Sequence, residues 1–117
     1  MSCIDMSENR INAYRVMWLF TMFDLPVTTK RERKAAALFR KELMKDGFTM
    51  LQFSVYIRHC ASVQSQEVHT KRVKALLPET GKVSILAVTD KQYSMIQSFV
   101  GAQVKKIKKE PLQLEIF

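Results

Sequence analysis

Residues 16–26 read Val-Met-Trp-Leu-Phe-Thr-Met-Phe-Asp-Leu-Pro, an almost uninterrupted apolar run that ends in one carboxylate and a proline. Apolar residues on both faces are typical of a central strand that is covered on each side. Because proline cannot donate a hydrogen bond to a sheet ladder, the strand, over about residues 15–23, is expected to end there. Asp24 therefore stands at the exit of this strand, and the functional interpretation depends on it.

A helix is predicted directly after this strand. Thr29 can cap its N-terminus, and Glu32, three residues later, completes a capping box. Gly47 is a typical terminator, so the helix is expected to end near Asp46. Apolar residues at helical spacing mark its buried stripe: Ala36, Phe39 and Leu43. The other face holds much of the positive charge of the chain: Lys30, Arg31, Arg33, Lys34, Arg40, Lys41 and Lys45.

A strand pair and a second helix follow. Residues 48–59 alternate loosely between apolar and polar, and the phase slips near Gln52, which predicts two strand segments or one strand with a bulge. Residues 61–77 predict a second helix that Pro78 closes. The expected core positions of this helix are Val63, Val68, Val73, Leu76 and Leu77.

A further strand is predicted over residues 83–88, after which Thr89 or Asp90 can cap a short helix. This helix is expected to run through Tyr93, Ile96 and Phe99. The order strand, helix, strand pair, helix, strand predicts a ferredoxin-like α+β sandwich. Such a fold has one antiparallel sheet with two helices on one face.

The chain divides into a polar lead over residues 1–13, one domain over residues 14–101 and a C-terminal segment over residues 102–117. In the last segment a basic linker precedes alternating apolar and polar residues, which predict a half-buried edge strand. We expect this strand to add to an open sheet edge, preferentially that of the partner in a homodimer. The predicted interface residues are Leu112, Leu114, Ile116 and Phe117.

The charge of the chain points to a polyanionic partner. The formal net charge is +8, and nucleic acid is favoured over a membrane surface because no basic amphipathic segment with bulky apolar anchors is evident. No apolar run is long enough to span a membrane. Cys3 and Cys60 form no metal-binding spacing, and no signal peptide precedes the domain, so a reduced, cytoplasmic location is expected.

A metal-dependent nuclease needs two or more hard oxygen ligands near one point. Asp24 has no second acid at a motif spacing, so a single chain is not expected to hold Mg²⁺. In a two-fold dimer, two copies of Asp24 near the axis would converge and favour a bound cation. Alternatively, Asp24 hydrogen-bonds the backbone of the turn that contains Pro26. The residues alone leave both interpretations open.

Other site chemistry has little support in the sequence. His59 and His69 lack the spacing of metal-binding motifs, and both are expected at the surface or half-buried. No Walker loop, GxGxxG or nucleophile motif is present, which argues against nucleotide hydrolysis and dinucleotide binding.

An RNA-recognition motif is a rival interpretation because it shares this topology. Exposed Phe20, Phe53 and Tyr56 would then stack on bases. However, residues 47–56 follow the first helix directly, whereas the corresponding aromatic strand of that motif comes one strand later. The basic-Gly-aromatic-Gly pattern is also missing, so packing of these rings in the core is favoured.

With these residues in view, the sequence resembles the small CRISPR-associated adaptation protein (Cas-two), in the form found in type II systems. The resemblance runs in order through residues 14–101, and its most specific part is Gln52-Phe53-Ser54-Val55-Tyr56. The other matching segments are Met22-Phe23-Asp24-Leu25-Pro26, Glu32-Arg33-Lys34, Phe39-Arg40-Lys41, Gly47-Phe48, Thr89, Lys91-Gln92-Tyr93 and Gly101.

The resemblance implies a ferredoxin-like homodimer that bridges two dimers of the CRISPR integrase (Cas-one). The dimer holds a double-stranded DNA prespacer while the integrase inserts its ends into the CRISPR array. The terminal strand, over residues 112–117, helps to build the dimer or to dock the integrase. Some members are Mg²⁺-dependent endonucleases that use the aspartate at the end of the first strand, the position of Asp24, so nuclease activity on RNA or DNA is the alternative expectation.

The basic helix face agrees with this resemblance, because Lys and Arg neutralise phosphates without reading bases. An adaptor for arbitrary foreign sequences should bind DNA in this way. The predicted phosphate-contact residues are Arg15, Lys30, Arg31, Arg33, Lys34, Lys41 and Arg58.

Overall fold

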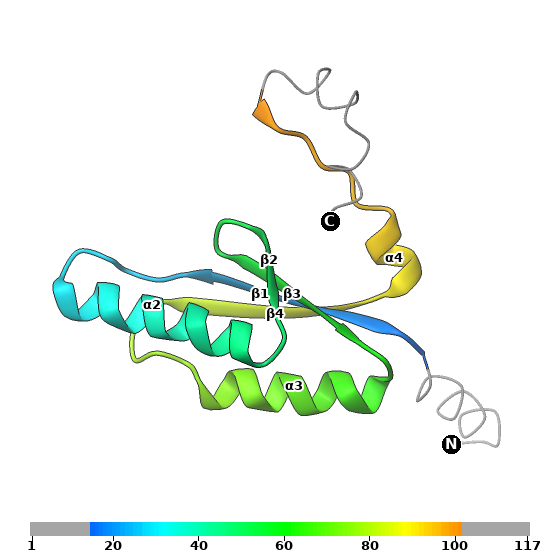
Figure 1. The fold of residues 1–117 in the computed structure, drawn as a ribbon, viewed down its shortest axis with the longest axis horizontal. Helices are drawn as coiled ribbons and strands as arrows, with labels where there is room; N and C mark the ends of the chain where they lie inside the picture. Colours follow the sequence, from blue (N-terminus) through cyan, green and yellow to red (C-terminus); the bar gives the residue numbers. More distant parts are fainter. Residues whose placement is uncertain (1–14, 102–117) are drawn as a thin grey trace.

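A computed structural model describes residues 15–101, which form four strands and three helices (Figure 1). In chain order they are β1 (Met17–Asp24), α2 (Lys30–Lys45), β2 (Thr49–Gln52), β3 (Val55–Cys60), α3 (Val63–Ala75), β4 (Lys82–Thr89) and α4 (Asp90–Ser94). Their order is the predicted one. The N-terminal lead and the predicted terminal strand with Leu112, Leu114, Ile116 and Phe117 lie outside the described residues. Among the described residues, no helix is both long and apolar enough to cross a membrane.

The four strands form one antiparallel sheet in the order β2-β3-β1-β4. β1 is central, as its apolar run predicts, and Leu19 faces Arg58 of β3 on one side and Ala87 of β4 on the other. The pairing of β2 with β3 shifts register between Met50 and Gln52, which confirms the predicted slip in phase.

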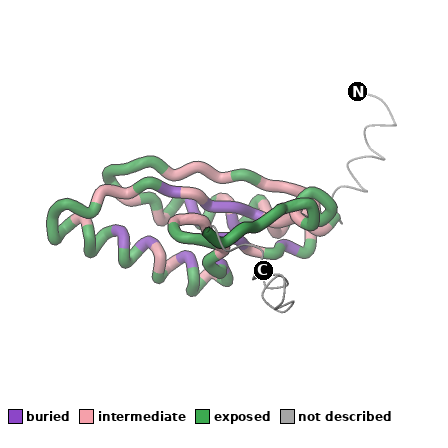
Figure 2. Tube along the Cα trace, turned by 90° about the horizontal axis from the view of Figure 1, so that it is seen from above, coloured by how far each residue is buried: buried purple, intermediate pink, exposed green. Residues whose placement is uncertain are grey.

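Both long helices lie on the same face of the sheet (Figure 1). Successive side chains of a strand point to opposite faces, and Leu19 and Phe23 of β1 pack into the core with Phe39 of α2 and Val73 of α3. Figure 2 shows the buried residues between the sheet and the helices. We call the other face of the sheet, away from α2 and α3, the open face.

The local signals for α2 are confirmed. The Thr29 side chain accepts a hydrogen bond from the Glu32 N–H, and Glu32 accepts from the Thr29 N–H, which completes the capping box. The helix ends before Gly47, whose φ of 95° is in the left-handed region that favours glycine. The predicted stripe is the buried one: Ala36, Phe39 and Leu43.

The prediction for α3 is wrong in two of its core positions. Val68 is 47% exposed and Leu77 is 48% exposed, and the helix is capped by Ser62 and ends at Ala75, so Leu77 lies beyond it. The inward position next to Val68 is taken by His69, which is hydrogen-bonded to Asp46 at the C-terminus of α2. The short α4 begins after the predicted cap Thr89 but ends at Ser94.

Candidate functional site

Asp24 lies at one end of the sheet, where β1 ends. Its backbone position faces Lys82, the first residue of β4, and the neighbouring Phe23 N–H donates a 3.0 Å hydrogen bond to the Ser54 carbonyl in the β2–β3 turn. The Asp24 side chain is exposed. Within residues 15–101 no hydrogen bond or ion pair joins its carboxylate to another group, including the turn that contains Pro26, so the carboxylate is available to a ligand.

Gly81 fixes the loop that leads from α3 to this end of the sheet. Its φ is 95°, and a Cβ on it would lie 2.9 Å from the Asp24 carbonyl oxygen and 2.7 Å from Leu25 Cδ2. Only glycine therefore lets the loop pack directly against the exit of β1. This contact holds Lys82 beside Asp24.

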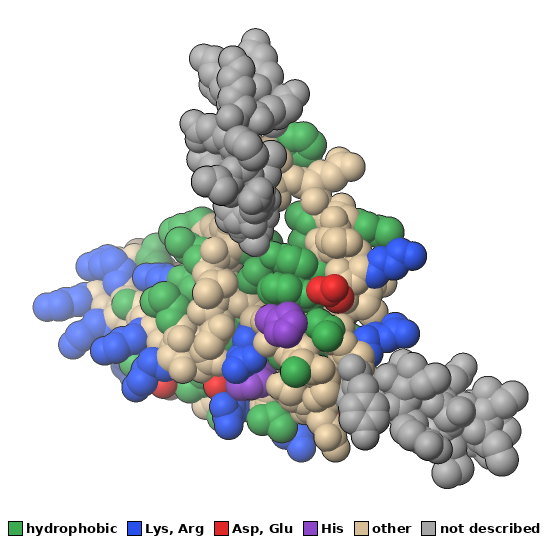
Figure 3. All heavy atoms as spheres, turned by 45° about the vertical axis from the view of Figure 1, so that its right-hand side comes forward, with side chains coloured by type: hydrophobic (Ala, Val, Ile, Leu, Met, Phe, Trp, Pro, Cys, Tyr) green, Lys and Arg blue, Asp and Glu red, His purple; other side chains and the backbone are tan. Residues whose placement is uncertain are grey.

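The predicted phosphate-contact residues are mostly free of internal contacts. Lys and Arg side chains gather on the α2 side of the molecule (Figure 3). Arg31 forms an exposed 3.5 Å ion pair with Glu79, which contributes little because solvent screens it. The exposed members of the predicted set are Arg15, Lys30, Arg31, Arg33, Lys34 and Lys41.

Two predicted phosphate contacts also hold the fold together. Arg33 donates hydrogen bonds of 3.2 and 3.0 Å to the carbonyls of Val27 and Thr28. Arg58 is half-buried and donates to the Asp46 carbonyl at 2.8 Å and to the His59 carbonyl at 2.7 Å. Two of the five N–H donors of Arg58 are therefore engaged by backbone carbonyls.

Asp46, at the C-terminus of α2, joins this helix to α3. Its carboxylate lies 2.7 Å from His69 Nδ1 and accepts a 2.8 Å hydrogen bond from Arg72 Nη1. Burial acts to raise the pKa of the Asp46 carboxyl, but the hydrogen bonds and charges of His69 and Arg72 outweigh it and lower the pKa below its usual value. His69 is buried, against expectation, whereas His59 is exposed.

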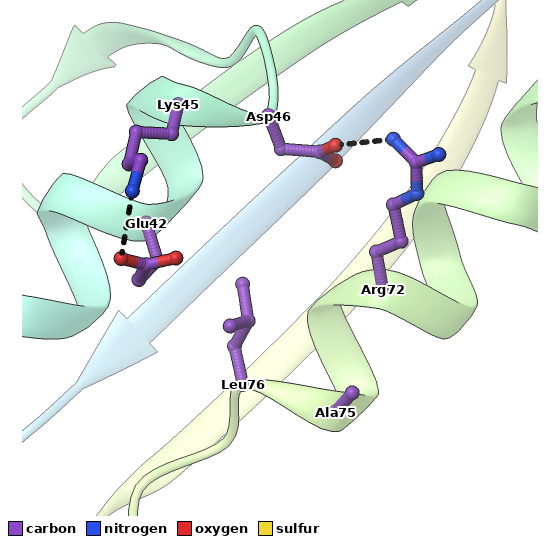
Figure 4. Close-up of a pocket in the computed structure, with 6 residues that line it drawn as sticks. All are labelled: Glu42, Lys45, Asp46, Arg72, Ala75 and Leu76. Carbon is purple, nitrogen blue, oxygen red and sulfur yellow. Dashed lines mark hydrogen bonds and ion pairs between the residues drawn. The ribbon is translucent and has the colours of Figure 1, made fainter.

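A surface pocket of about 310 Å³ opens next to this network, between α2 and α3. Figure 4 shows Asp46 and Arg72 joined across it, with Glu42 and Lys45 paired on the α2 side at 3.7 Å. Since its charged groups are satisfied by one another, the pocket offers no free cluster for chemistry.

Aromatic side chains cover part of the open face at the opposite end of the sheet from Asp24. Trp18 stacks on Tyr93 with ring centroids 3.9 Å apart, and Trp18 Nε1 donates a 2.8 Å hydrogen bond to Asp90. Phe20 lies 6.2 Å from the Tyr93 ring. Burial raises the pKa of the Tyr93 hydroxyl. The stack holds α4 against the sheet.

The three rings that an RNA-recognition motif would expose are separated. Tyr56 is 3% exposed and packs in the core, as favoured above, whereas Phe20 is 9% exposed and lies on the open face near Tyr93. For Phe53 the favoured packing in the core is wrong, because this residue lies in the β2–β3 turn and its side chain is 84% exposed. The stacking platform of that motif is therefore absent from the open face.

The described residues offer Mg²⁺ no ready-made cluster of ligands. No group of three or more His, Cys, Asp or Glu side chains comes together within residues 15–101. Asp24 supplies one hard carboxylate at an exposed position, and Mg²⁺ is held by one or two carboxylates together with water and phosphate oxygens. Two Asp24 side chains across a dimer axis would form a suitable set.

Comparison with known families gives the classification. Residues 17–96, which run from the start of β1 past α4, match the family described as CRISPR associated protein Cas2. The chain belongs to the Cas2 family. The matched span includes Asp24, the β2–β3 hairpin and both long helices.

Curated Cas2 relatives match nearly the whole chain. A protein of Flavobacterium psychrophilum is 49% identical over 113 residues, which cover 97% of this chain and 98% of that protein. A protein of Parvibaculum lavamentivorans is 50% identical over 101 residues, with 86% and 100% covered. A protein of Paracidovorax avenae is 47% identical over 107 residues, with 92% and 99% covered. Each of the three is named a CRISPR-associated endoribonuclease.

Sequence reasoning on this Cas2 chain missed Lys82 and the Asp46 network. Lys82 is 58 residues from Asp24, and only the register of β1 with β4 brings the two together. His69 lies 23 residues from Asp46. For Lys82 and Asp24, the local signal in the sequence is a single cation at the start of a strand. For His69 and Asp46 the sequence offers no local signal.

Proposed function

We propose that this Cas2-family chain is a ferredoxin-like, homodimeric adaptor in CRISPR spacer acquisition, in the form found in type II systems. It bridges two dimers of the integrase Cas-one and holds the prespacer duplex. The observation that carries the proposal is the row of exposed cations on α2, with Lys30, Lys34 and Lys41 free of internal ion pairs within the described residues, on a chain with a net charge of +8.

Phosphate contacts suit this function because they are independent of base sequence. Duplex DNA carries a dense line of negative charge, and each cation that neutralises a phosphate releases counterions. These contacts position the duplex without specifying it. An adaptor that receives arbitrary foreign DNA requires this kind of binding.

The dimer is supported by apolar surface that one chain leaves uncovered. Leu86, on the open face opposite Phe20, is 49% exposed. After α4, exposed apolar side chains follow in close succession: Met95, Ile96, Phe99 and Val100. Exposed apolar side chains in such number favour an interface, and in the proposal the strand over residues 112–117 adds to the partner or to the integrase.

The test measures binding of labelled duplex DNA in the presence of purified integrase over a series of salt concentrations. Lys30→Gln, Lys34→Gln and Lys41→Gln are combined in one variant. A second variant removes the same charge elsewhere, at Lys71, Lys74 and Lys91. The α2 variant should bind more weakly, with a salt slope smaller by about 0.9 for each phosphate that it no longer neutralises. Equally weakened binding by both variants would argue against the α2 surface.

A second candidate function is a Mg²⁺-dependent endonuclease centred on two Asp24 side chains across the dimer. It is favoured by the exposed Asp24 carboxylate, which has no hydrogen bond or ion pair within residues 15–101, and by the names of the relatives, which are endoribonucleases. Bound Mg²⁺ would stabilise the negative charge that develops on the scissile phosphate. The role of Asp24 is to hold the cation, and that of the basic first turn of α2 is to hold the nucleic acid.

Asp24→Ala and Asp24→Asn separate the two functions. Both variants are first checked for dimers by light scattering, and spacer integration and Mg²⁺-dependent cleavage are then measured. Full integration without cleavage supports an adaptor that is also a nuclease. If the wild-type protein supports full integration but cleaves neither RNA nor DNA, the adaptor function is supported and the nuclease function is not. Failure of integration by an intact complex would show that Asp24 is needed for the reaction itself.

A further inference from the structure

Two surface pockets lie along the same side of α2. The pocket of about 310 Å³ is lined by Glu42 and Lys45 of this helix, and a second pocket of about 300 Å³ is lined by Arg31 and Ala35. Residues spaced three and four apart share one side of a helix, so Leu38 lies between the two pockets. The opposite wall is the end of α3 and the loop after it. We call this surface, between residues 31–45 and residues 72–80, the interhelical groove.

The middle of the interhelical groove is apolar. Leu38 is 57% exposed, although the buried stripe of α2 runs next to it, and Ala35 and Ala75 are exposed as well. Leu76, which follows the last residue of α3, points into the larger pocket (Figure 4). Two recesses with an exposed leucine between them offer places for the apolar side chains of a binding partner.

The interhelical groove is bordered by an excess of positive charge. Together α2 and α3 carry ten Lys and Arg side chains and three Glu side chains. Lys34 and Lys41, one helical turn before and after Leu38, form no ion pair within the described residues. A partner with carboxylates beside its apolar side chains is therefore complementary to this surface. The carboxylates that line the groove already have partners within the chain: Glu32 at the cap of α2, Glu79 with Arg31, Glu42 with Lys45, and Asp46 with Arg72.

From this arrangement we propose that the interhelical groove docks an amphipathic helix of a partner protein, with acidic residues beside its apolar face. Arg31 and Glu42, which mark the two pockets, are eleven residues apart, so the pockets are separated by about 16 Å along α2, or about three helical turns. A helix laid along the groove presents apolar side chains to it at positions i, i+4, i+7 and i+11. Its carboxylates then meet Lys34 and Lys41.

The groove suits a protein helix rather than nucleic acid. A DNA backbone is charged along its whole length and leaves apolar recesses unfilled, so Leu38 gives no advantage to DNA binding. The groove also lies on the helix side of the sheet, so docking leaves the open face to a second copy (Figure 1). Because Lys34 and Lys41 belong to the surface proposed for DNA, the helix competes with the duplex. This competition, unlike the docking itself, rests on the proposed function.

The experiment measures fluorescence anisotropy of a labelled synthetic helical peptide with the full chain. The peptide carries Leu at positions i, i+4, i+7 and i+11 and Glu beside them, and its control has the same composition with the Leu residues spread around the helix. Leu38→Ser should weaken binding of the first peptide at least about tenfold, as the loss of one buried leucine contact does.

Met44→Ser is the matched control. Met44 is 53% exposed on the same helix, but it follows Leu38 by six residues and therefore lies on another side of α2. Met44→Ser should bind the peptide as wild type does. Circular dichroism should show both variants folded, because both side chains are exposed.

Two further variants test the other wall and the charges. Ala75→Gln fills part of the larger pocket from the α3 side and should also weaken peptide binding. Lys34→Gln combined with Lys41→Gln should reduce the dependence of peptide binding on salt, because salt screens exposed charges. Duplex DNA should displace the peptide from the wild type.

Several outcomes would overturn the inference. Equal binding of the two peptides by the wild type is one, and equal loss of binding in Leu38→Ser and Met44→Ser is another. Dissociation of the dimer by Leu38→Ser in light scattering would assign the groove to an interface between copies. Weaker duplex binding by Leu38→Ser, with unchanged peptide binding, would assign it to nucleic acid. Failure of the adaptor proposal is distinguishable: a wild type that binds the peptide but no duplex DNA retains the groove and lacks that function.

Discussion

At the scale of single residues, Asp46 is a carboxylate in an unfavourable position, the C-terminus of α2. The negative end of a helix disfavours a carboxylate, so the partners His69 and Arg72 must offset that cost as well as its burial. Asp46→Asn should lower the free energy of unfolding by about 1–3 kcal/mol, since it weakens two bonds to a nearly buried group. Urea unfolding at pH 7 measures this loss of stability. Glu42→Gln is the control, because it weakens only the surface pair with Lys45.

The pH dependence of this effect has a definite sign. Burial raises the pKa of the Asp46 carboxyl, but His69 and Arg72 together lower it below its value in the unfolded chain. A carboxyl with a lowered folded-state pKa contributes stability above the unfolded value, about pH 4, and loses it as the pH falls through the folded value. The difference between wild type and Asp46→Asn should therefore be full at pH 7 and shrink below about pH 4. A difference that stays constant down to pH 2 would contradict this account.

Gly81 and Gly101 give a matched pair at the same scale. Both have positive φ values, 95° and 57°, but a Cβ on Gly81 would meet Leu25 and the Asp24 carbonyl, whereas one on Gly101 meets nothing within 4 Å. Gly101→Ala should cost about 1–2 kcal/mol, from backbone conformation alone. Gly81→Ala should cost more than this, because the loop must also move away from β1. Thermal unfolding of both variants measures the difference, and equal destabilisation would show that the loop yields freely.

At the scale of elements, α4 depends on its contacts with the sheet. A helix of five residues is not stable alone, and the Trp18–Tyr93 stack and the bond to Asp90 hold it. Trp18→Phe should remove amide protection in residues 91–94 while it lowers global stability by about 1.5 kcal/mol or less. Hydrogen exchange measures this, and Asp90→Asn, which keeps an acceptor oxygen, is the control. Unchanged protection in Trp18→Phe would assign the stability of α4 to its capping box.

The predicted elements were correct where the signal is local. The bounds of β1 and α2 follow closely from the sequence, because the residues that end β1 and begin and end α2 act on the backbone next to them. These residues are Pro26, Thr29 and Gly47. For α3 the spacing of Val63, Val68 and Val73 is not helical, and the buried face was misassigned. The buried face of α3 includes His69, whose hydrogen-bonding partner, Asp46, lies at the end of α2.

The candidate site was predictable only in part, for the same reason. Asp24 was located because the strand run ends at it, and its exposure follows from that position. Lys82 joins it through strand register, which a single sequence does not specify. Arg58 resembled the other surface cations in the sequence, but its side chain is half-buried and donates to two backbone carbonyls.

At the scale of the whole molecule, the described residues place α2 and α3 on one face of the sheet and the short α4 on part of the other. A sheet face that carries apolar side chains is normally buried against another layer. We expect a second copy of the chain to supply that layer. Leu86, 49% exposed on the open face, then becomes an interface residue, whereas Leu38, 57% exposed on α2, stays in solvent.

Leu86→Glu and Leu38→Glu test this arrangement with the same change of charge and shape. A carboxylate at Leu86 would be desolvated in the dimer without a partner, so the dissociation constant of the dimer should rise at least about tenfold. Leu38→Glu should leave it unchanged, and circular dichroism should show both variants folded because both side chains are exposed in one chain. Light scattering over a concentration series measures the dimer. If Leu38→Glu dissociated it and Leu86→Glu did not, the helices would form the interface, and the basic face of α2 would be unavailable to DNA.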